Sequence, residues 1–111
     1  MSTDRTHLLH CEERLRRIQK YAEGGRAAFM ASRMHQDAVL WNLEMICLCA
    51  KRITGEERQR HLNVDWHRLL NLCHGMLDGE MAADPEHVWH IIEADVPLLQ
   101  HQVRLVLTAK A

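Results

Sequence analysis

Hydrophobic side chains recur every three or four residues along most of the chain, the spacing that places them on one face of an α-helix. The pattern predicts four main helices, with apolar stripes over residues 8–22, 34–53, 66–77 and 88–106. A short helical turn over residues 27–31, anchored by Phe29, and a polar connector over residues 56–63 link them. The fold class expected is therefore all-α, an antiparallel up-and-down helical bundle.

Glycine, proline and aspartate residues mark where these helices begin, end and bend. Gly24 and Gly25 follow the first stripe and predict its end. Asp84 is expected to cap the last helix, with Pro85 in its first turn, where no amide donor is missed. Pro97 lies inside that last helix and predicts a bend there.

The helix over residues 34–53 carries two apolar stripes. One consists of Met34, Ala38, Trp41, Met45 and Leu48, and the other of Val39, Leu43, Ile46, Ala50 and Ile53. Two stripes predict that this helix is covered on more than one side, as the central helix of a bundle is. This surface and three tryptophans are more than a small bundle readily hides, which favours a homodimer.

Composition indicates one globular domain over residues 1–111, with 47% hydrophobic and 26% charged residues. Lys and Arg number 14 against 15 Asp and Glu, a balance that excludes a generic basic coat for nucleic acid. No secretory signal is visible, and the longest apolar-rich run, residues 38–50, is too short to span a bilayer. The expectation is a soluble, cytoplasmic protein.

The four cysteines lie inside the apolar stripes, so buried thiols are expected rather than disulfides. Cys47 and Cys49 are two residues apart and point about 200° away from each other on a helix. They cannot bridge each other or clamp one ion, and the prediction is that they fill the core.

Two histidine pairs, His7 with His10 and His87 with His90, each lie on one helical face, where they could share a metal ion. A bare pair is under-coordinated, and solvated surface histidines are the simpler interpretation. Arg68 and His74 could together hold a phosphate and move a proton, or their proximity in sequence could be a chance pairing among nine histidines. Arg68 stands six residues before His74, a separation of about 240° on a helix, so the two cooperate only across a helix break.

Two segments in order, residues 65–80 and 84–98, resemble the HepT branch of the HEPN superfamily. That branch has a Pro-Trp helix start, an Arg-Asn-x-x-x-His-Gly-Tyr stretch, then Asp-Pro-x-x-x-Trp and a Leu-Pro bend. Residues 36–44 are similar to its long second helix, and Phe29 fits its linking turn. The resemblance implies a helical bundle that pairs as a homodimer.

The same resemblance implies a prokaryotic toxin-antitoxin pair. The HEPN protein is the toxin, and a minimal nucleotidyltransferase (MNT) from a neighbouring gene is its antitoxin. The toxin's activity is RNA cleavage without a metal or other cofactor, by an arginine and a histidine that converge in a cleft between protomers. Physically, the arginine neutralises the scissile phosphate while the histidine exchanges a proton.

This sequence departs from the family pattern at those catalytic positions. Placing the family's tryptophan on Trp66 puts Cys73 at the arginine, His74 at the asparagine and Asp78 at the histidine. Glu80 stands where the family has a tyrosine that the antitoxin can modify. The expected site is therefore neutral to anionic.

A cleft carboxylate of the family is also replaced. Its Gly-Glu-Ala on the central helix corresponds to residues 47–49, Cys-Leu-Cys in this chain. We expect Asn42, Glu44 and Leu48 to line the cleft, although Asn42 and Glu44 also fit a solvent-facing sector of the helix.

The function predicted is that of a HepT-like toxin-antitoxin protein that is weak or inactive as a nuclease. One alternative is an active RNase with displaced residues, His74 with Arg68 or Arg104. A second is a new hydrolytic set of Cys73, His74 and Asp78, although neighbouring helical residues diverge by about 100°. A third is a metal-binding bundle that uses the histidine pairs.

Overall fold

The computed structural model describes residues 3–77 and 84–109, which form helices with no strand among them. The helices are α1 (Thr3–Tyr21), α2 (Gly25–Met30), α3 (Arg33–Arg52), α4 (Gly55–Arg60), α5 (Trp66–Leu77), α6 (Pro85–Ala94) and α7 (Val96–Thr108). The all-α class is confirmed. No helix in the described part of the chain is long and apolar enough to cross a membrane.

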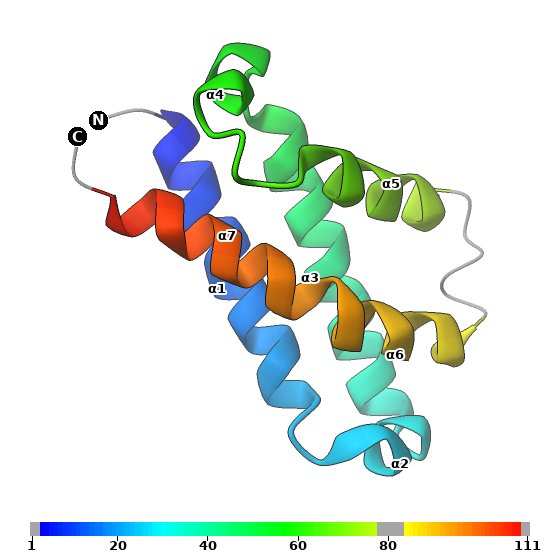
Figure 1. Ribbon diagram of the computed structural model, residues 1–111. Helices are drawn as coiled ribbons and strands as arrows, with labels where there is room; N and C mark the ends of the chain where they lie inside the picture. The colour runs from blue at the N-terminus through cyan, green and yellow to red at the C-terminus, as the bar shows by residue number, and fades with distance from the viewer. Residues whose placement is uncertain (1–2, 78–83, 110–111) are drawn as a thin grey trace.

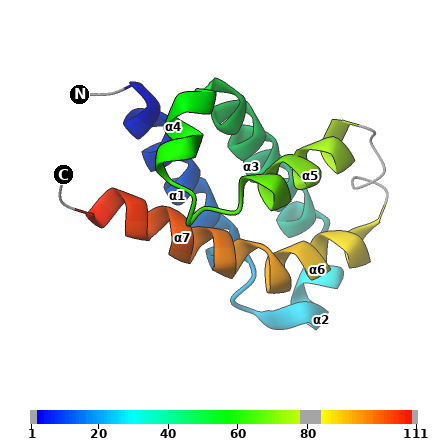
Figure 2. The ribbon, with the colours of Figure 1, turned by 45° about the horizontal axis from the view of Figure 1, so that its top comes forward.

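Two long antiparallel helices, α1 and α3, form the frame of the bundle (Figure 1). Helix α7 packs on α1. Helix α6, which directly precedes α7 in the chain, contacts α2 and α3. Helix α5 packs on α3, and in both ribbon views it lies on the opposite side of α6 from α2 (Figures 1 and 2). The guanidinium of Arg5 donates a hydrogen bond of 3.0 Å to the carbonyl oxygen of Leu107, which joins the start of α1 to the end of α7.

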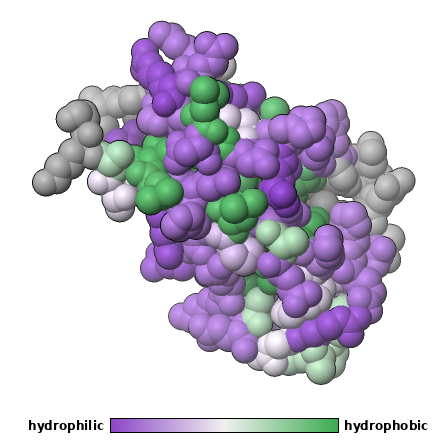
Figure 3. All heavy atoms as spheres, in the orientation of Figure 1, coloured by the Kyte–Doolittle hydropathy of each residue, from purple (hydrophilic) through white to green (hydrophobic). Residues whose placement is uncertain are grey.

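The core is built from one face of each long helix. Its largest fully buried side chains are Phe29, Leu8, Ile18, Leu43, Ile46, Leu99, Val39, Val64, Val88, Val96 and Cys11. The Phe29 ring, which anchors α2 as expected, lies 5.4 Å from the ring of Trp89 on α6. The face drawn in Figure 3 is largely hydrophilic, with hydrophobic residues in a few small patches. Burial of this core is the main stabilising term.

Of the two apolar stripes on α3, only one is buried. Its members Val39, Leu43, Ile46, Ala50 and Ile53 all belong to the core. On the other stripe, Met34, Trp41 and Leu48 remain exposed. The prediction that the bundle covers both stripes was therefore wrong for a single protomer.

The predicted start and bend of the last helix are confirmed. The Asp84 carboxylate accepts hydrogen bonds from the amides of Glu86 and His87, and Pro85 occupies the first turn of α6. The helix is interrupted between Ala94 and Val96, at the start of the turn that contains Pro97. Proline lacks the amide that would continue the helical hydrogen bonds, so the chain restarts as α7.

Helix α4 forms where a polar connector was predicted. The Thr54 hydroxyl caps it by accepting a hydrogen bond from the Glu57 amide. Arg60 pairs with Glu56 and Glu57, each at 3.1 Å. Arg58 also donates to the carbonyl oxygen of Ala50 at 2.8 Å and accepts at its own carbonyl oxygen from the Trp66 indole at 3.0 Å. Since α4 has no buried residue, polar contacts hold it, and hydrophobic spacing could not reveal it.

The expectation that all four cysteines are thiols was wrong. Cys47 on α3 and Cys73 on α5 form a disulfide, with their Cα atoms 5.5 Å apart. Spacing along one helix shows which face a cysteine occupies but not which side chain a neighbouring helix places opposite it. Cys47 and Cys49 do not bridge each other, in agreement with the prediction, and Cys11 and Cys49 are free thiols.

Leu43→Ala tests the importance of the buried stripe on α3. Leu43 is fully buried, so its truncation should lower the free energy of unfolding by about 2–5 kcal/mol. Urea unfolding followed by circular dichroism measures this. Leu62→Ala makes the same chemical change at an exposed position and should change stability by less than about 0.5 kcal/mol. Equal effects would contradict the core assignment.

Candidate functional site

A cleft between α3 and α5 contains several positions that the sequence assigned to the family's active site. Its volume is about 220 Å³. The lining residues are Trp41, Glu44, Met45, Cys47, Leu48, Lys51 and Cys73. Three of these, Glu44, Leu48 and Cys73, come from the sequence-based site. We call this hollow the α3–α5 cleft.

The Cys47–Cys73 disulfide forms part of the wall of the α3–α5 cleft. Cys73 is 4% exposed and Cys47 is 6% exposed, so the bond lies largely in the core. The position that the resemblance gives to a catalytic arginine therefore holds a neutral sulfur already bonded to its neighbour. Glu44 and Lys51 are the charged residues of the described lining, and their charges are opposite.

Sequence reasoning missed Trp41, Met45 and Lys51 as parts of this cleft. They share a helical face with Glu44 and Leu48, since residues three or four apart on a helix are neighbours. That spacing was the signal that could have found them. Trp41 and Met45 had been assigned to a stripe expected to be covered, which hid their place at an open cleft.

Two other predicted site residues, Asn42 and His74, do not line this cleft. Asn42 is buried and turned toward α1, where its Oδ1 accepts a hydrogen bond of 3.3 Å from Arg14. Its Nδ2 donates to the carbonyl oxygen of Ala38 at 2.8 Å. His74 is exposed on α5 and does not line the cleft. Asp78 and Glu80 lie outside the described residues.

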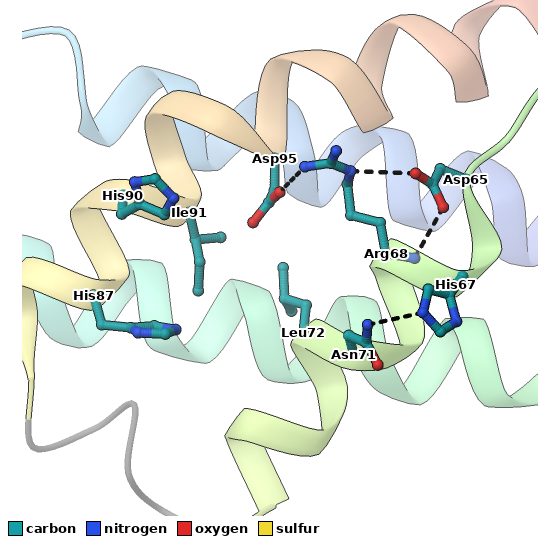
Figure 4. Close-up of a pocket in the computed structure, with 9 residues that line it drawn as sticks. All are labelled: Asp65, His67, Arg68, Asn71, Leu72, His87, His90, Ile91 and Asp95. Carbon is teal, nitrogen blue, oxygen red and sulfur yellow. Dashed lines mark hydrogen bonds and ion pairs between the residues drawn. The ribbon is translucent and has the colours of Figure 1, made fainter.

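A larger groove of about 500 Å³ lies between α5 and α6 (Figure 4). Histidines from both helices line it: His67 from α5, and His87 and His90 from α6. Asn71, one turn after His67, lies within hydrogen-bonding distance of its ring at 3.2 Å. We call this hollow the α5–α6 groove.

Arg68, also in the α5–α6 groove, is held by two carboxylates (Figure 4). Its guanidinium donates to Asp95 at 2.5 Å and to Asp65 at 3.3 Å. These bonds, first to Asp95 and then to Asp65, raise the pKa of Arg68. The pKa of Asp65 is lowered, chiefly because its carboxylate accepts a hydrogen bond from the Arg68 amide. Arg68 therefore stays protonated, and its positive charge is balanced by the two carboxylates.

The displaced catalytic pairs are not brought together. Arg68 lines the α5–α6 groove, which does not include His74. Arg104 lies on α7 and donates to Glu12 of α1 at 2.8 Å. Each arginine thus has a carboxylate partner, and neither lines a described pocket with His74.

The histidine pairs lie on different parts of the molecule. His87 and His90 line the α5–α6 groove, whereas His7 and His10 lie on α1. Within residues 3–77 and 84–109, no group of three or more His, Cys, Asp or Glu side chains is arranged to hold a metal ion. The geometry therefore gives the metal-binding alternative no support.

A third hollow, the α1–α3 pocket, has a volume of about 270 Å³. Its lining residues are His10, Glu13, Arg14, Met45, Leu48, Cys49 and Arg52. Cys49, expected to fill the core, is instead only partly buried and opens into this pocket. Met45 and Leu48 line both this pocket and the α3–α5 cleft, so the two hollows share a wall.

Comparison with known proteins identifies the family. Residues 11–106 match the family described as Ribonuclease HepT-like. The chain therefore belongs to the HepT-like ribonuclease family of the HEPN superfamily, as the motifs of residues 65–98 indicated. No solved structure matches the chain.

Two relatives from Methanocaldococcus jannaschii are similar to this chain. One, named "Gamma-glutamylcyclotransferase and putative RNase", is 22% identical over 102 residues, which cover 91% of this chain and 46% of the relative. The other, named "Putative RNase", is 27% identical over 78 residues, 70% of this chain and 72% of the relative. The chain thus spans about half the length of the first relative.

Asp65→Asn tests the electrostatics around Arg68. The folded-state pKa of Asp65 lies below its ordinary value of 3.8, so its charge stabilises the fold above that pH. That contribution is lost as the pH falls through the lowered pKa. Wild type should be more stable than Asp65→Asn near neutral pH, with a difference that shrinks in acid.

Urea unfolding over a pH series measures this difference. Asp37→Asn is the matched control, since the Asp37 carboxylate is an exposed ion-pair partner 3.9 Å from Arg33. A stability difference for Asp65→Asn that grows on acidification would contradict the assignment.

Proposed function

We propose that this chain is a HepT-like HEPN protein of a prokaryotic toxin-antitoxin system whose nuclease activity is weak or absent. One observation carries the proposal: Cys73, at the position of the family's catalytic arginine, is buried and disulfide-bonded to Cys47. The proposal treats residues 1–111 as a single HEPN-like helical domain.

RNA cleavage without a metal needs a fixed cation beside the scissile phosphate and a group that exchanges a proton with the ribose hydroxyl or leaving oxygen. The described lining of the α3–α5 cleft contains one positive charge, that of Lys51, and one negative charge, that of Glu44. Phosphate anions are therefore not concentrated there. Loss of one transition-state donor typically costs a factor of about 100–1,000 in rate.

We further propose that the chain still binds its partners although the α3–α5 cleft no longer cleaves RNA. The partners are a second copy of the chain and a cognate MNT-type nucleotidyltransferase antitoxin. The exposed stripe of α3 supports the homodimer, with exposed fractions of 74% for Met34, 55% for Trp41 and 45% for Leu48. These residues are spaced by seven, so they follow one line along the helix, as at helix–helix interfaces.

Such a dimer would place the α3–α5 cleft at its interface, because Trp41 and Leu48 belong to both the stripe and the cleft. The cleft would then face a second copy of itself across a two-fold axis. This arrangement agrees with the family's site between protomers.

Trp41→Glu tests the dimer. A charge in the middle of the stripe should be costly to bury, so light scattering at micromolar concentration should show a dimer for wild type and a monomer for Trp41→Glu. Leu62→Glu places the same charge at an exposed residue away from the stripe and should leave the dimer intact. A monomeric wild type would refute this interface.

RNA cleavage in the presence of EDTA tests the loss of activity. Wild type should leave single-stranded RNA intact. A rebuilt variant with Cys47→Gly, Leu48→Glu, Cys73→Arg and Asp78→His restores the family's catalytic arginine and histidine and its cleft carboxylate. If it folds by circular dichroism, it should cleave at least about 100-fold faster than the same variant without Cys73→Arg.

Wild-type cleavage as fast as that of the rebuilt variant is the outcome that would overturn the proposal. Cleavage that survives EDTA and disappears in His74→Ala would show that an active site with displaced residues exists. Gel analysis of a labelled RNA separates these results.

A further inference from the structure

The two free cysteines, Cys11 on α1 and Cys49 on α3, lie near each other where these helices pack. Cys11 is buried at the interface of the two helices, and Cys49 opposite it opens into the α1–α3 pocket. Their side chains are hydrogen-bonded to each other. The Cys11 sulfur also lies 3.9 Å from the carbonyl oxygen of Ile46. Ile46 precedes Cys49 by one helical turn, so the buried Cys11 sulfur lies beside the turn of α3 that carries the partly exposed Cys49.

The two sulfurs differ in protonation. The hydrogen bond from the Cys11 thiol is the largest influence that lowers the pKa of Cys49, and it outweighs the opposing effect of burial. His10, by charge and hydrogen bond, and His7, by charge, lower it further, to about 6. The same contact and burial raise the pKa of Cys11. These influences favour the thiolate at Cys49 and the protonated thiol at Cys11.

The charged groups around Cys49 also favour the anion. From α1, the α1–α3 pocket is lined by His10, Glu13 and Arg14, and from α3 by Arg52. Glu13 is paired with Arg17 at 2.8 Å, outside the pocket lining. Two arginines thus face one already paired carboxylate. Partly exposed thiolates in such electropositive surroundings are the reactive class of cysteine.

We propose that Cys49 and Cys11 form a redox-reactive thiol pair that reduces hydroperoxides, with Cys49 as the attacking sulfur and Cys11 as the resolving thiol. This proposal does not depend on the proposed function, since none of its steps uses the α3–α5 cleft.

The Cys49 thiolate attacks one peroxide oxygen, the O–O bond breaks, and the leaving oxygen takes up a proton as water or alcohol. Cys49 becomes a sulfenic acid, oxidised by two electrons. Cys11 then attacks the Cys49 sulfur, a Cys11–Cys49 disulfide forms, and the sulfenic oxygen leaves as water with the thiol proton. The arginines of the pocket stabilise the negative charge that develops on the leaving oxygen.

The Cys47–Cys73 disulfide cannot take part in the reaction of Cys49 with Cys11. Cys47 and Cys73 are already joined, so neither supplies a resolving thiol. Cys47 also lies on a different face of α3 from Cys49, because residues two apart on a helix diverge by about 200°. Oxidation at Cys49 should therefore proceed to Cys11.

Alkylation rates with iodoacetamide across a pH series test the thiolate. The rate at Cys49 should rise with a midpoint near pH 6. Cys11→Ala removes the thiol donor and should move that midpoint up toward about 8.5, the ordinary value for cysteine. At pH 6 the larger thiolate fraction, reduced by the lower nucleophilicity of a more acidic thiol, predicts a rate about tenfold above that of a free-cysteine peptide.

Hydrogen peroxide treatment followed by non-reducing peptide mapping tests the pair. Wild type should lose two hydrogen atoms and yield a cross-linked peptide that contains Cys11 and Cys49. Cys11→Ser should stop at the sulfenic acid, which dimedone captures at Cys49. Cys49→Ser should leave Cys11 unmodified, because its thiol is protonated and buried.

If Cys11→Ser fails to fold, the wild-type protein alone decides the question. A midpoint near 8.5, or peroxide treatment that yields no Cys11–Cys49 cross-link, would overturn the proposal. The midpoint near 6 together with the cross-link supports it. Neither result depends on whether the chain cleaves RNA.

Discussion

The packing of α1 against α3 is the interaction on which the rest of the structure depends. Leu43 and Ile46 of α3 and Ile18 of α1 are fully buried members of one core cluster. With this face of α3 occupied, neighbouring faces carry the disulfide to α5, the α3–α5 cleft and the exposed stripe, and Cys49 lies at the edge of the contact with α1. A change in the rotation of α3 would displace all of them together.

The disulfide joins two positions that the resemblance assigns to the family's site, so it changes the chemistry expected there by more than one substitution would. An arginine at position 73 would need room and a counter-charge, whereas Cys47 and Cys73 together fill that space with a neutral bridge. Membership of the HepT-like ribonuclease family and the capacity to cleave RNA are thus separate questions for this chain.

Much of the fold could be predicted from hydrophobic spacing, because a buried stripe leaves a periodic signal. The buried stripe of α3, the cap at Asp84 and the break before Pro97 all follow from local rules. Helix α4 could not be predicted in this way, since the cap at Thr54, ion pairs and the hydrogen bonds of Arg58 with Ala50 and Trp66 hold it without burial. The site was harder to predict, because Cys73 meets Cys47, and Cys11 meets Cys49, only through packing between helices.

The disulfide also has a topological consequence. It joins residues 26 apart in sequence and so encloses α4 and the first part of α5 in a covalent ring. A proteolytic nick anywhere in the exposed polar stretch of α4 would open this ring without releasing a fragment. The disulfide would still link α5 to α3, so the two cleaved parts of the chain would stay covalently joined until a reductant broke the bond.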